Sequence, residues 1–164
     1  MEAKSKEKVT QWISSLVGQS LTDAYRWEAM PGFFFERTQH NPTALHAYSR
    51  CIVSQSGHTL IDSEDIFVPA PGVEIDPDND YGIGDCVFDR DMPKLYKLLP
   101  VKVISASCED DGTIHVCFEK DLQLSCTPWG GNEYEAWRLF HPERHEGIVF
   151  HNDGRLLDYA DIES

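Results

Sequence analysis

Apolar residues near the N-terminus recur with the period of an α-helix. They are Val9, Trp12, Ile13, Leu16 and Val17. Because their spacing is i, i+3, i+4, i+7 and i+8, all five side chains fall on one helical face. Gly18 follows directly, at the place where a left-handed glycine often ends a helix. The pattern predicts an N-terminal amphipathic helix that packs its apolar face against a core.

Beyond this helix the pattern changes to the two-residue alternation of β-strands. In the first part of the chain we expect strands over residues 21–29, 33–35, 43–53 and 59–61, with turns at Met30-Pro31-Gly32 and Gln55-Ser56-Gly57. In the second part we expect a short helix with Pro93 in its first turn and Pro100 after its end. Strands should follow over residues 101–107, 114–118, 122–126, 134–140, 148–150 and 155–157.

These elements predict an α+β fold, with an N-terminal amphipathic helix and antiparallel meander sheets, because short turns join consecutive strands. Residues 16–24 resemble residues 98–106, since both runs leave a helix and enter a strand. We therefore expect two similar helix-plus-sheet halves, residues 1–67 and 92–164, packed as one unit. An acidic connection rich in Pro and Gly, residues 68–91, would join them. Chance similarity among amphipathic strands is the alternative.

The number of cysteines and the length of apolar runs indicate the cellular location. The 164 residues include five cysteines and no Cys-x-x-Cys motif, which argues against a disulfide framework and favours the reducing cytoplasm. No run approaches the roughly 18 apolar residues that span a bilayer, and the N-terminus lacks the apolar core of a secretory signal. We expect a cytoplasmic protein that does not enter a membrane.

Net charge narrows the classes of partner. The formal charge is −14 at pH 7, which repels nucleic acid and anionic membranes and attracts cationic surfaces. Lys and Arg total 14 and are dispersed along the chain, so direct binding of nucleic acid is not expected. A general contribution to solubility is the alternative explanation.

Acidic residues concentrate in the middle of the chain. Residues 62–91 contain ten acidic residues and one cation, Arg90, so this acidic segment carries −9 of the −14. Within it, residues 68–85 are predicted to form one long loop, and loops of this length are often functional. We predict that the acidic segment binds a basic partner; a solvated connection between the halves is the alternative. The predicted binding residues are Asp62, Glu64, Asp65, Glu74, Asp76, Asp78, Asp80, Tyr81 and Asp85.

Motifs for catalysis and metal binding are incomplete. The chain has no Gly-x-Ser-x-Gly elbow and no Walker A loop. His141, His145 and His151 suit a polar turn better than a zinc site. Residues 76–82 place acids at positions one, three and five of an EF-type loop, but Tyr81 replaces its glycine. We predict no catalytic residue, metal or cofactor. An enzyme with a cryptic hydrolase site of histidines and acids, and a calcium-stabilised structural module, stay open as alternatives.

Several stretches carry a family resemblance. These are YEAWRLF at residues 134–140, DGTIHVCFE at residues 111–119, WISSLVGQSL at residues 12–21 and LHAYSR at residues 45–50. They resemble small uncharacterised bacterial cytosolic proteins, and similar proteins include immunity proteins of contact-dependent toxin systems. The resemblance implies a helix-plus-sheet fold, no cofactor and a toxin as partner. It supplies no catalytic residue, and the acidic segment is not part of the pattern.

Charge and resemblance lead to one functional hypothesis. We expect a non-enzymatic inhibitor or immunity-type protein that neutralises a basic protein partner, such as a nuclease toxin. The acidic segment would cover the basic cleft of that partner in the place of phosphate, and the opposite charges would speed their association.

Overall fold

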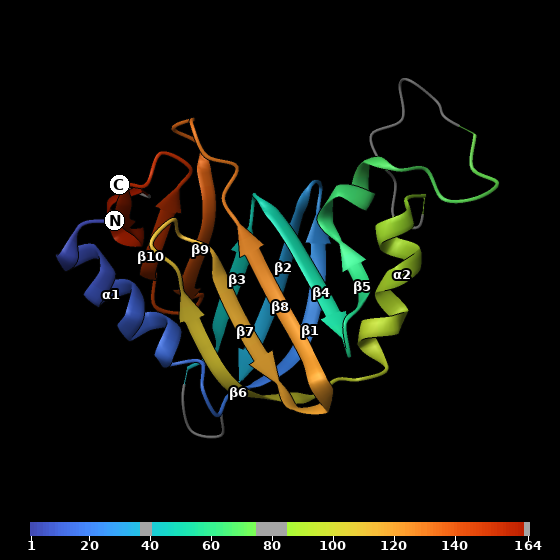
Figure 1. Ribbon diagram of the computed structural model, residues 1–164, viewed down its shortest axis with the longest axis horizontal. Coiled ribbons are helices and arrows are strands. Elements are labelled where there is room, and N and C mark those ends of the chain that lie inside the picture. Colours follow the sequence, from blue (N-terminus) through green and yellow to red (C-terminus); the bar gives the residue numbers. More distant parts are fainter. Residues whose placement is uncertain (37–40, 75–84, 163–164) are drawn as a thin grey trace.

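The computed structural model describes residues 1–36, 41–74 and 85–162 of the chain. Its helices are α1 (Ala3–Ser14), α2 (Val87–Tyr96) and α3 (Tyr159–Ile162), with two 3-10 turns, η1 (Ser63–Phe67) and η2 (Glu119–Asp121). Its strands are β1 (Ser20–Trp27), β2 (Met30–Glu36), β3 (Thr43–Ala47), β4 (Arg50–Gln55), β5 (His58–Asp62), β6 (Val101–Cys108), β7 (Ile114–Phe118), β8 (Leu122–Thr127), β9 (Glu135–His141), β10 (Glu146–His151) and β11 (Leu156–Asp158). The predicted α+β class with an N-terminal helix is confirmed (Figure 1).

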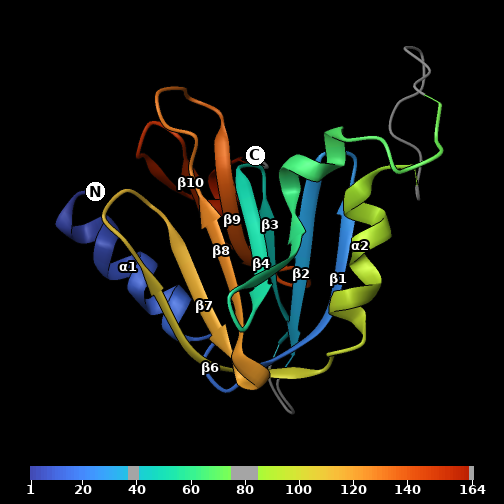
Figure 2. The same cartoon turned by 45° about the vertical axis from the view of Figure 1, so that its right-hand side comes forward.

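The described strands form one antiparallel sheet that folds over into two layers. Their order is β11-β10-β9-β3-β2-β1-β6-β7-β8-β4-β5. Figure 1 shows β1, β2, β3, β9 and β10 lying behind β6, β7, β8, β4 and β5, and in the turned view of Figure 2 β1 and β2 lie to the right of β4, β7 and β8. We name these the β2 layer and the β7 layer. The layers are joined where β1 meets β6, through the pairs Ser20↔Lys102 and Leu21↔Val101.

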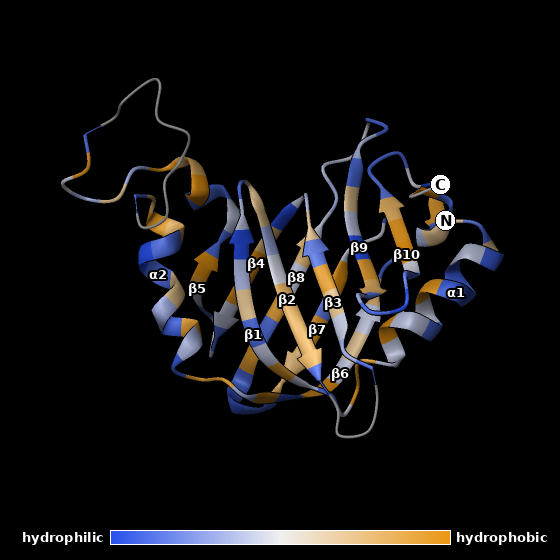
Figure 3. Ribbon diagram, turned by 180° about the vertical axis from the view of Figure 1, so that it is seen from behind, coloured by the Kyte–Doolittle hydropathy of each residue, from blue (hydrophilic) through white to orange (hydrophobic). Residues whose placement is uncertain are grey.

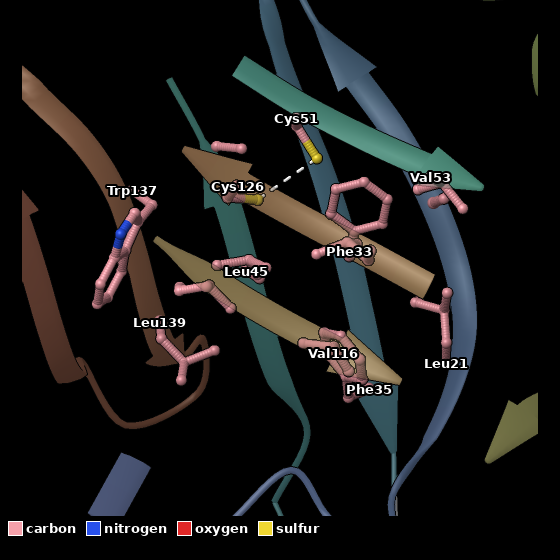
Figure 4. Close-up of a cluster of buried hydrophobic side chains, with 14 of the residues drawn as sticks. Leu21, Phe33, Phe35, Leu45, Cys51, Val53, Val116, Cys126, Trp137 and Leu139 are labelled. Atoms are coloured by element: carbon pink, nitrogen blue, oxygen red, sulfur yellow. Dashed lines mark hydrogen bonds between the residues drawn. The ribbon is translucent and has the colours of Figure 1, made fainter. Parts of the chain in front are cut away.

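The hydrophobic core lies between the two layers. Phe35 of β2 stacks on Phe118 of β7 with ring centroids 6.3 Å apart. On the adjacent strands β4 and β8, Cys51 faces Cys126 with sulfur atoms 3.4 Å apart. Figure 4 shows these thiols among apolar side chains from both layers. Each large side chain buried in this way contributes roughly 1.5–3 kcal/mol, so apolar burial holds the layers together.

Helices α1 and α2 close the two open sides of this sandwich (Figure 1). Helix α1 contacts β6 and β10 and buries Val9 and Ile13, and Gly18 after it has a left-handed backbone with φ 85°. Helix α2 contacts β5 and η1, and the Tyr96 hydroxyl donates to the Ala24 carbonyl of β1 at 2.8 Å. The predicted amphipathic helix is therefore confirmed, but it ends at Ser14, and Gly18 lies beyond the following turn, where its amide donates to the Val103 carbonyl of β6. No helix in the described part of the chain is both long and apolar enough to cross a membrane.

The single strand predicted over residues 43–53 is two strands. Tyr48 and Ser49 separate β3 from β4, because both backbone amides donate to the Ala136 carbonyl, at 2.9 and 3.0 Å. The chain turns there and passes from the β2 layer to the β7 layer, where β4 pairs with β8. The alternation of apolar and polar residues did not reveal this break between β3 and β4, because every second residue stays buried across it, as Ser49 and Cys51 do.

The turn predicted at Met30-Pro31-Gly32 is also wrong. These residues belong to β2, and Met30 pairs with Trp27. The chain reverses instead at Glu28 and Ala29, where Glu28 adopts a positive φ of 51°. Gly32 does not form a turn here. It lies within the strand because the absence of a side chain leaves room for the Tyr25 ring of β1.

Helix α2 begins earlier than predicted. Pro93 lies inside it and not in its first turn, so the helix lacks one backbone hydrogen bond at that position. Phe88, Met92 and Leu95 are buried and follow the spacing i, i+4, i+7. This apolar stripe begins before Pro93 and sets the position of the helix.

Strands from the two predicted halves interleave in the sheet. Strand β1 pairs with β6, β3 with β9 and β4 with β8. Residues 1–67 and 92–164 thus share one core. The internal similarity of the halves stays a prediction.

Candidate functional site

The predicted acidic residues lie along η1 and the chain that follows it. Asp62 ends β5, and Glu64 and Asp65 belong to η1. Glu74 and Asp85 lie outside helices and strands. The other predicted residues, Asp76, Asp78, Asp80 and Tyr81, lie outside the described residues, as does most of the EF-type loop.

Part of the acidic segment is engaged with the protein's own arginines. Arg50 Nη2 lies 2.9 Å from Asp62 Oδ2 and 3.4 Å from Glu64 Oε2. Asp62 also accepts a hydrogen bond from the Glu64 amide at 3.1 Å, which caps η1. Burial, followed by the charges of Asp62, Asp91 and Glu64, raises the pKa of Asp65. Asp62 and Glu64 therefore stabilise η1 and the end of β5 as well as contributing negative charge, whereas the surroundings of Asp65 disfavour its charged form.

A different feature stands out at one end of the sandwich. Here lie the β1–β2 turn (residues 28–29), the corner between β3 and β4 (residues 48–49) and the β8–β9 loop (residues 128–134), as Figure 1 shows. The strand register places them together, since Ala47 pairs with Trp137 and Arg50 pairs with Thr127. We name this the loop end.

Four aromatic side chains at the loop end are exposed, and we name them the aromatic rim. They are Trp27 (73% exposed), Tyr48 (43%), Trp129 (55%) and Tyr134 (75%). Tryptophan and tyrosine side chains bury most of their surface in folded proteins. When they stay exposed beside one another they commonly mark a binding surface, because each offers a large apolar area.

The β8–β9 loop is held in place by Asn152 in the β10–β11 turn. Asn152 Oδ1 accepts a hydrogen bond from the backbone amide of Trp129 at 2.8 Å. The backbone amide of Asn152 donates to the Tyr134 carbonyl at 2.9 Å. Asn152 Nδ2 also donates to Asn132 Oδ1 at 3.0 Å. Asn152 is itself buried. The backbone that carries Trp129 and Tyr134 is therefore fixed to the sheet.

Tyr48 is fixed by an arginine beneath it. The Arg138 guanidinium lies 5.5 Å from the Tyr48 ring centroid and 5.3 Å from that of Tyr159. Two hydrogen bonds of 2.6 Å join Arg138 to the carboxylate of Glu135. The hydrogen bonds to Glu135 are the main reason that the pKa of Arg138 is raised. The Tyr48 ring thus packs against the ion pair of Arg138 and Glu135, whose charges cancel.

A polar row crosses the outer face of the β2 layer, the face seen in Figure 3, and ends at this ion pair. Tyr25, Gly32, His46 and Arg138 are consecutive partners on β1, β2, β3 and β9. The Tyr25 hydroxyl reaches over Gly32 to His46 Nε2 at 2.6 Å. Burial, and then the charge of Arg138, lower the pKa of His46 to about 4. His46 is therefore neutral at pH 7, and its Nε2 shares a hydrogen bond with the Tyr25 hydroxyl.

Between the hairpin and the corner lies a hollow of about 340 Å³, and among the described residues its lining is Trp27, Glu28, Ala29, Met30 and Tyr48. A smaller hollow of about 170 Å³ lies beside α1, lined by Gln11, Trp12, Ser15 and His141. In the part of the chain that the structure describes, neither lining brings a histidine beside a carboxylate. Neither hollow therefore supplies the acid–base pair that a hydrolase site would need.

Of the predicted histidine cluster, His141 and His145 lie at the β9–β10 turn, whereas His151 lies at the opposite end of β10. His141 Nδ1 lies 3.1 Å from the Pro42 carbonyl and His151 Nδ1 lies 2.7 Å from the Glu133 carbonyl. Residues 142–145 join β9 to β10, so the predicted polar turn is confirmed. Within residues 1–36, 41–74 and 85–162, no three His, Cys, Asp or Glu side chains gather as a metal site requires.

Sequence reasoning missed the aromatic rim. Trp27 and Tyr48 stand in runs that read as strands, where an aromatic is usually half-buried against a neighbour. A signal did exist in Trp129-Gly130-Gly131-Asn132, since an aromatic in a glycine-rich loop has no strand partner to pack on.

Comparison with known proteins identifies the family. The chain belongs to DUF6188, a family of unknown function, which matches residues 51–159 and so covers more than half of the 164 residues. The predicted membership of an uncharacterised family is confirmed. No curated protein and no solved structure matches the chain.

Proposed function

We propose that this member of the DUF6188 family is a non-enzymatic binding protein of inhibitor or immunity type, and that it neutralises a basic protein partner such as a nuclease toxin. The partner docks on the loop end. The observation that carries the proposal is the aromatic rim, which exposes two tryptophans and two tyrosines on a backbone held by hydrogen bonds.

The composition of the rim supports protein binding. Tryptophan and tyrosine, with arginine, are the residues that most often dominate the binding energy of protein interfaces. The rim is also ordered before binding, because Asn152 holds the β8–β9 loop and Arg138 holds Tyr48. A preorganised surface loses less conformational entropy when a partner binds.

Charge supports a basic partner. The net charge of −14 attracts a cationic surface over distances of about 8–10 Å at physiological salt. Glu28 adjoins Trp27 at the loop end, and Glu133 adjoins Tyr134. Within the acidic segment, Glu74 and Asp85 remain candidate contacts, whereas Asp62 and Glu64 share Arg50. We therefore place the aromatic rim at the centre of the interface and the acidic residues around it.

The test is affinity capture from a lysate of the source organism at salt concentrations from roughly 50 to 500 mM, which span weak to strong screening of surface charge. We expect a basic protein to be retained, with retention falling at least about tenfold as salt rises. If the partner is a nuclease, its activity should fall in proportion to the added protein. Retention that does not depend on salt, or retention of acidic proteins only, would contradict the proposal.

A further inference from the structure

The hollow at the loop end has the shape and chemistry of a site for one side chain. Its lining includes two aromatic residues, Trp27 and Tyr48, together with Met30, which is only 6% exposed. Its volume of about 340 Å³ is at the lower limit of small-ligand pockets, roughly 300–1,000 Å³. It therefore has room for a long side chain.

The charge at this hollow favours a cation. The faces of tryptophan and tyrosine rings attract cations, and Glu28 adds a carboxylate to the lining. The turn that carries Glu28 is held by Arg26 Nη1, which donates to the Glu28 carbonyl at 2.7 Å. Arg26 itself forms a two-bond ion pair with Asp89, at 2.8 and 2.6 Å. Its positive charge is therefore offset.

Arginine matches these groups better than lysine. A guanidinium is planar, stacks on aromatic rings and binds a carboxylate through two parallel N–H groups. The protein already contains such an arrangement, because Arg138 lies over Tyr48 and Tyr159 and forms two bonds to Glu135. Trp27, Tyr48 and Glu28 offer the same combination of two rings and one carboxylate.

We infer that the hollow lined by Trp27, Glu28, Met30 and Tyr48 receives an arginine side chain of the basic partner. This inference rests on the proposed function and identifies the partner group that anchors at the loop end. Arg138 also approaches Tyr48, but Glu135 neutralises it. An incoming guanidinium therefore meets an ion pair and not an isolated positive charge.

The test is an NMR titration of the ¹⁵N-labelled protein, followed at the indole N–H of Trp27. The probes are N-acetyl-arginine amide, its neutral isostere N-acetyl-citrulline amide, and N-acetyl-lysine amide, at matched ionic strength. We expect the arginine probe to shift the Trp27 signal saturably and to bind at least about fivefold more tightly than citrulline or lysine. The buried Trp137 indole and the exposed Trp129 indole are internal controls that should not move.

Variants of the pocket separate charge from shape. Glu28→Gln should weaken binding of the arginine probe at least about threefold and leave the citrulline probe unchanged. Tyr48→Ala should weaken binding of the arginine probe, whereas Trp129→Ala, on the rim but outside the lining, should not. Equal binding of citrulline, preference for lysine, or no shift of Trp27 would each overturn the inference.

Failure of this inference differs from failure of the proposed function. If a basic partner is captured in a salt-dependent manner and Glu28→Gln and Tyr48→Ala leave its affinity unchanged, the arginine site is wrong and the binding function stands. If the arginine probe binds and no basic partner is retained at any salt concentration, the docking function is wrong.

Discussion

At the residue scale, a tight constraint lies where Tyr25 crosses Gly32 to reach His46. A methyl group at Gly32 would meet the Tyr25 ring at 2.2 Å from Cε2 and 2.4 Å from Cζ. The ring would have to swing away, and the 2.6 Å contact between its hydroxyl and His46 Nε2 would break. The glycine is therefore required by the side chain of the neighbouring strand.

Replacing this glycine should destabilise the protein only while Tyr25 is present. We predict that Gly32→Ala lowers the free energy of unfolding by about 1–3 kcal/mol, the usual cost of overpacking. In a Tyr25→Ala background the same change should cost less than about 0.5 kcal/mol, because the clash is gone. Urea unfolding of the four proteins in this cycle measures the coupling. Equal costs in both backgrounds would show that the Tyr25 ring does not constrain Gly32.

His46 should make stability depend on pH. Its pKa is lowered from 6.5 to about 4 in the folded protein, so between these values the unfolded chain takes up a proton that the folded chain does not. The stabilisation by neutral His46 is complete above pH 6.5 and declines as the pH falls towards 4. The total loss is up to about 3 kcal/mol.

We therefore predict that His46→Gln, which keeps a hydrogen-bonding side chain for Tyr25 and cannot titrate, loses less stability than the wild type on acidification through this window. Urea unfolding at several pH values gives the comparison, and the carboxylates common to both proteins cancel. His58→Gln, at an exposed position, is the matched control and should follow the wild type. Parallel curves for His46→Gln and the wild type would refute the assignment.

At the element scale, helix α2 is tied to the β2 layer by a buried ion pair. The Arg26 and Asp89 side chains are 7% and 12% exposed, with Nη2 and Oδ2 2.6 Å apart. The hydrogen bond to Asp89 is the main cause that raises the pKa of Arg26. Removing one partner leaves a buried charge without its counter-ion, which costs more than the pair contributes.

Asp89→Asn should therefore lower the free energy of unfolding by about 2–4 kcal/mol and loosen α2. The matched control is Asp91→Asn on the same helix. Asp91 pairs with Lys94, whose side chain is 55% exposed, so this change should cost less than about 1 kcal/mol. Chemical unfolding gives the energies, and amide hydrogen exchange should show faster opening of α2 for Asp89→Asn. Equal effects of the two substitutions would mean that burial of the Arg26 pair is unimportant.

Prediction of the elements from sequence succeeded where local pattern decides the structure. The stripe of α1, the hairpin at Ser56-Gly57 and the turn at Gly112 follow from spacing and from residues that accept positive φ, as Gly57 and Gly112 do. It failed at Tyr48-Ser49, where hydrogen bonds to the distant Ala136 break a strand. A contact between residues 87 positions apart leaves no trace in local alternation.

At the scale of the whole molecule, folding creates the loop end from segments far apart in sequence. Trp27 and Tyr48 come to line one hollow, and Tyr134 joins them because β9 pairs with β3. Composition led to the prediction that the acidic segment binds a partner, which stays a prediction, but it could not show that Arg50 is shared by Asp62 and Glu64. It also could not reveal the aromatic rim, since the rim depends on the order of strands in the sheet.

The most direct test of docking at the loop end is the affinity of the captured basic partner for a rim variant, measured by isothermal titration calorimetry. We predict that Trp129→Ala/Tyr134→Ala weakens binding at least about thirtyfold, as expected when interface aromatics are lost. Ile104→Ala is the control, since Ile104 is 60% exposed on β6, away from the loop end, and it should leave the affinity within about twofold. Both variants should keep the wild-type unfolding midpoint. Unchanged affinity of the rim variant, or an equal loss with Ile104→Ala, would contradict docking at the loop end.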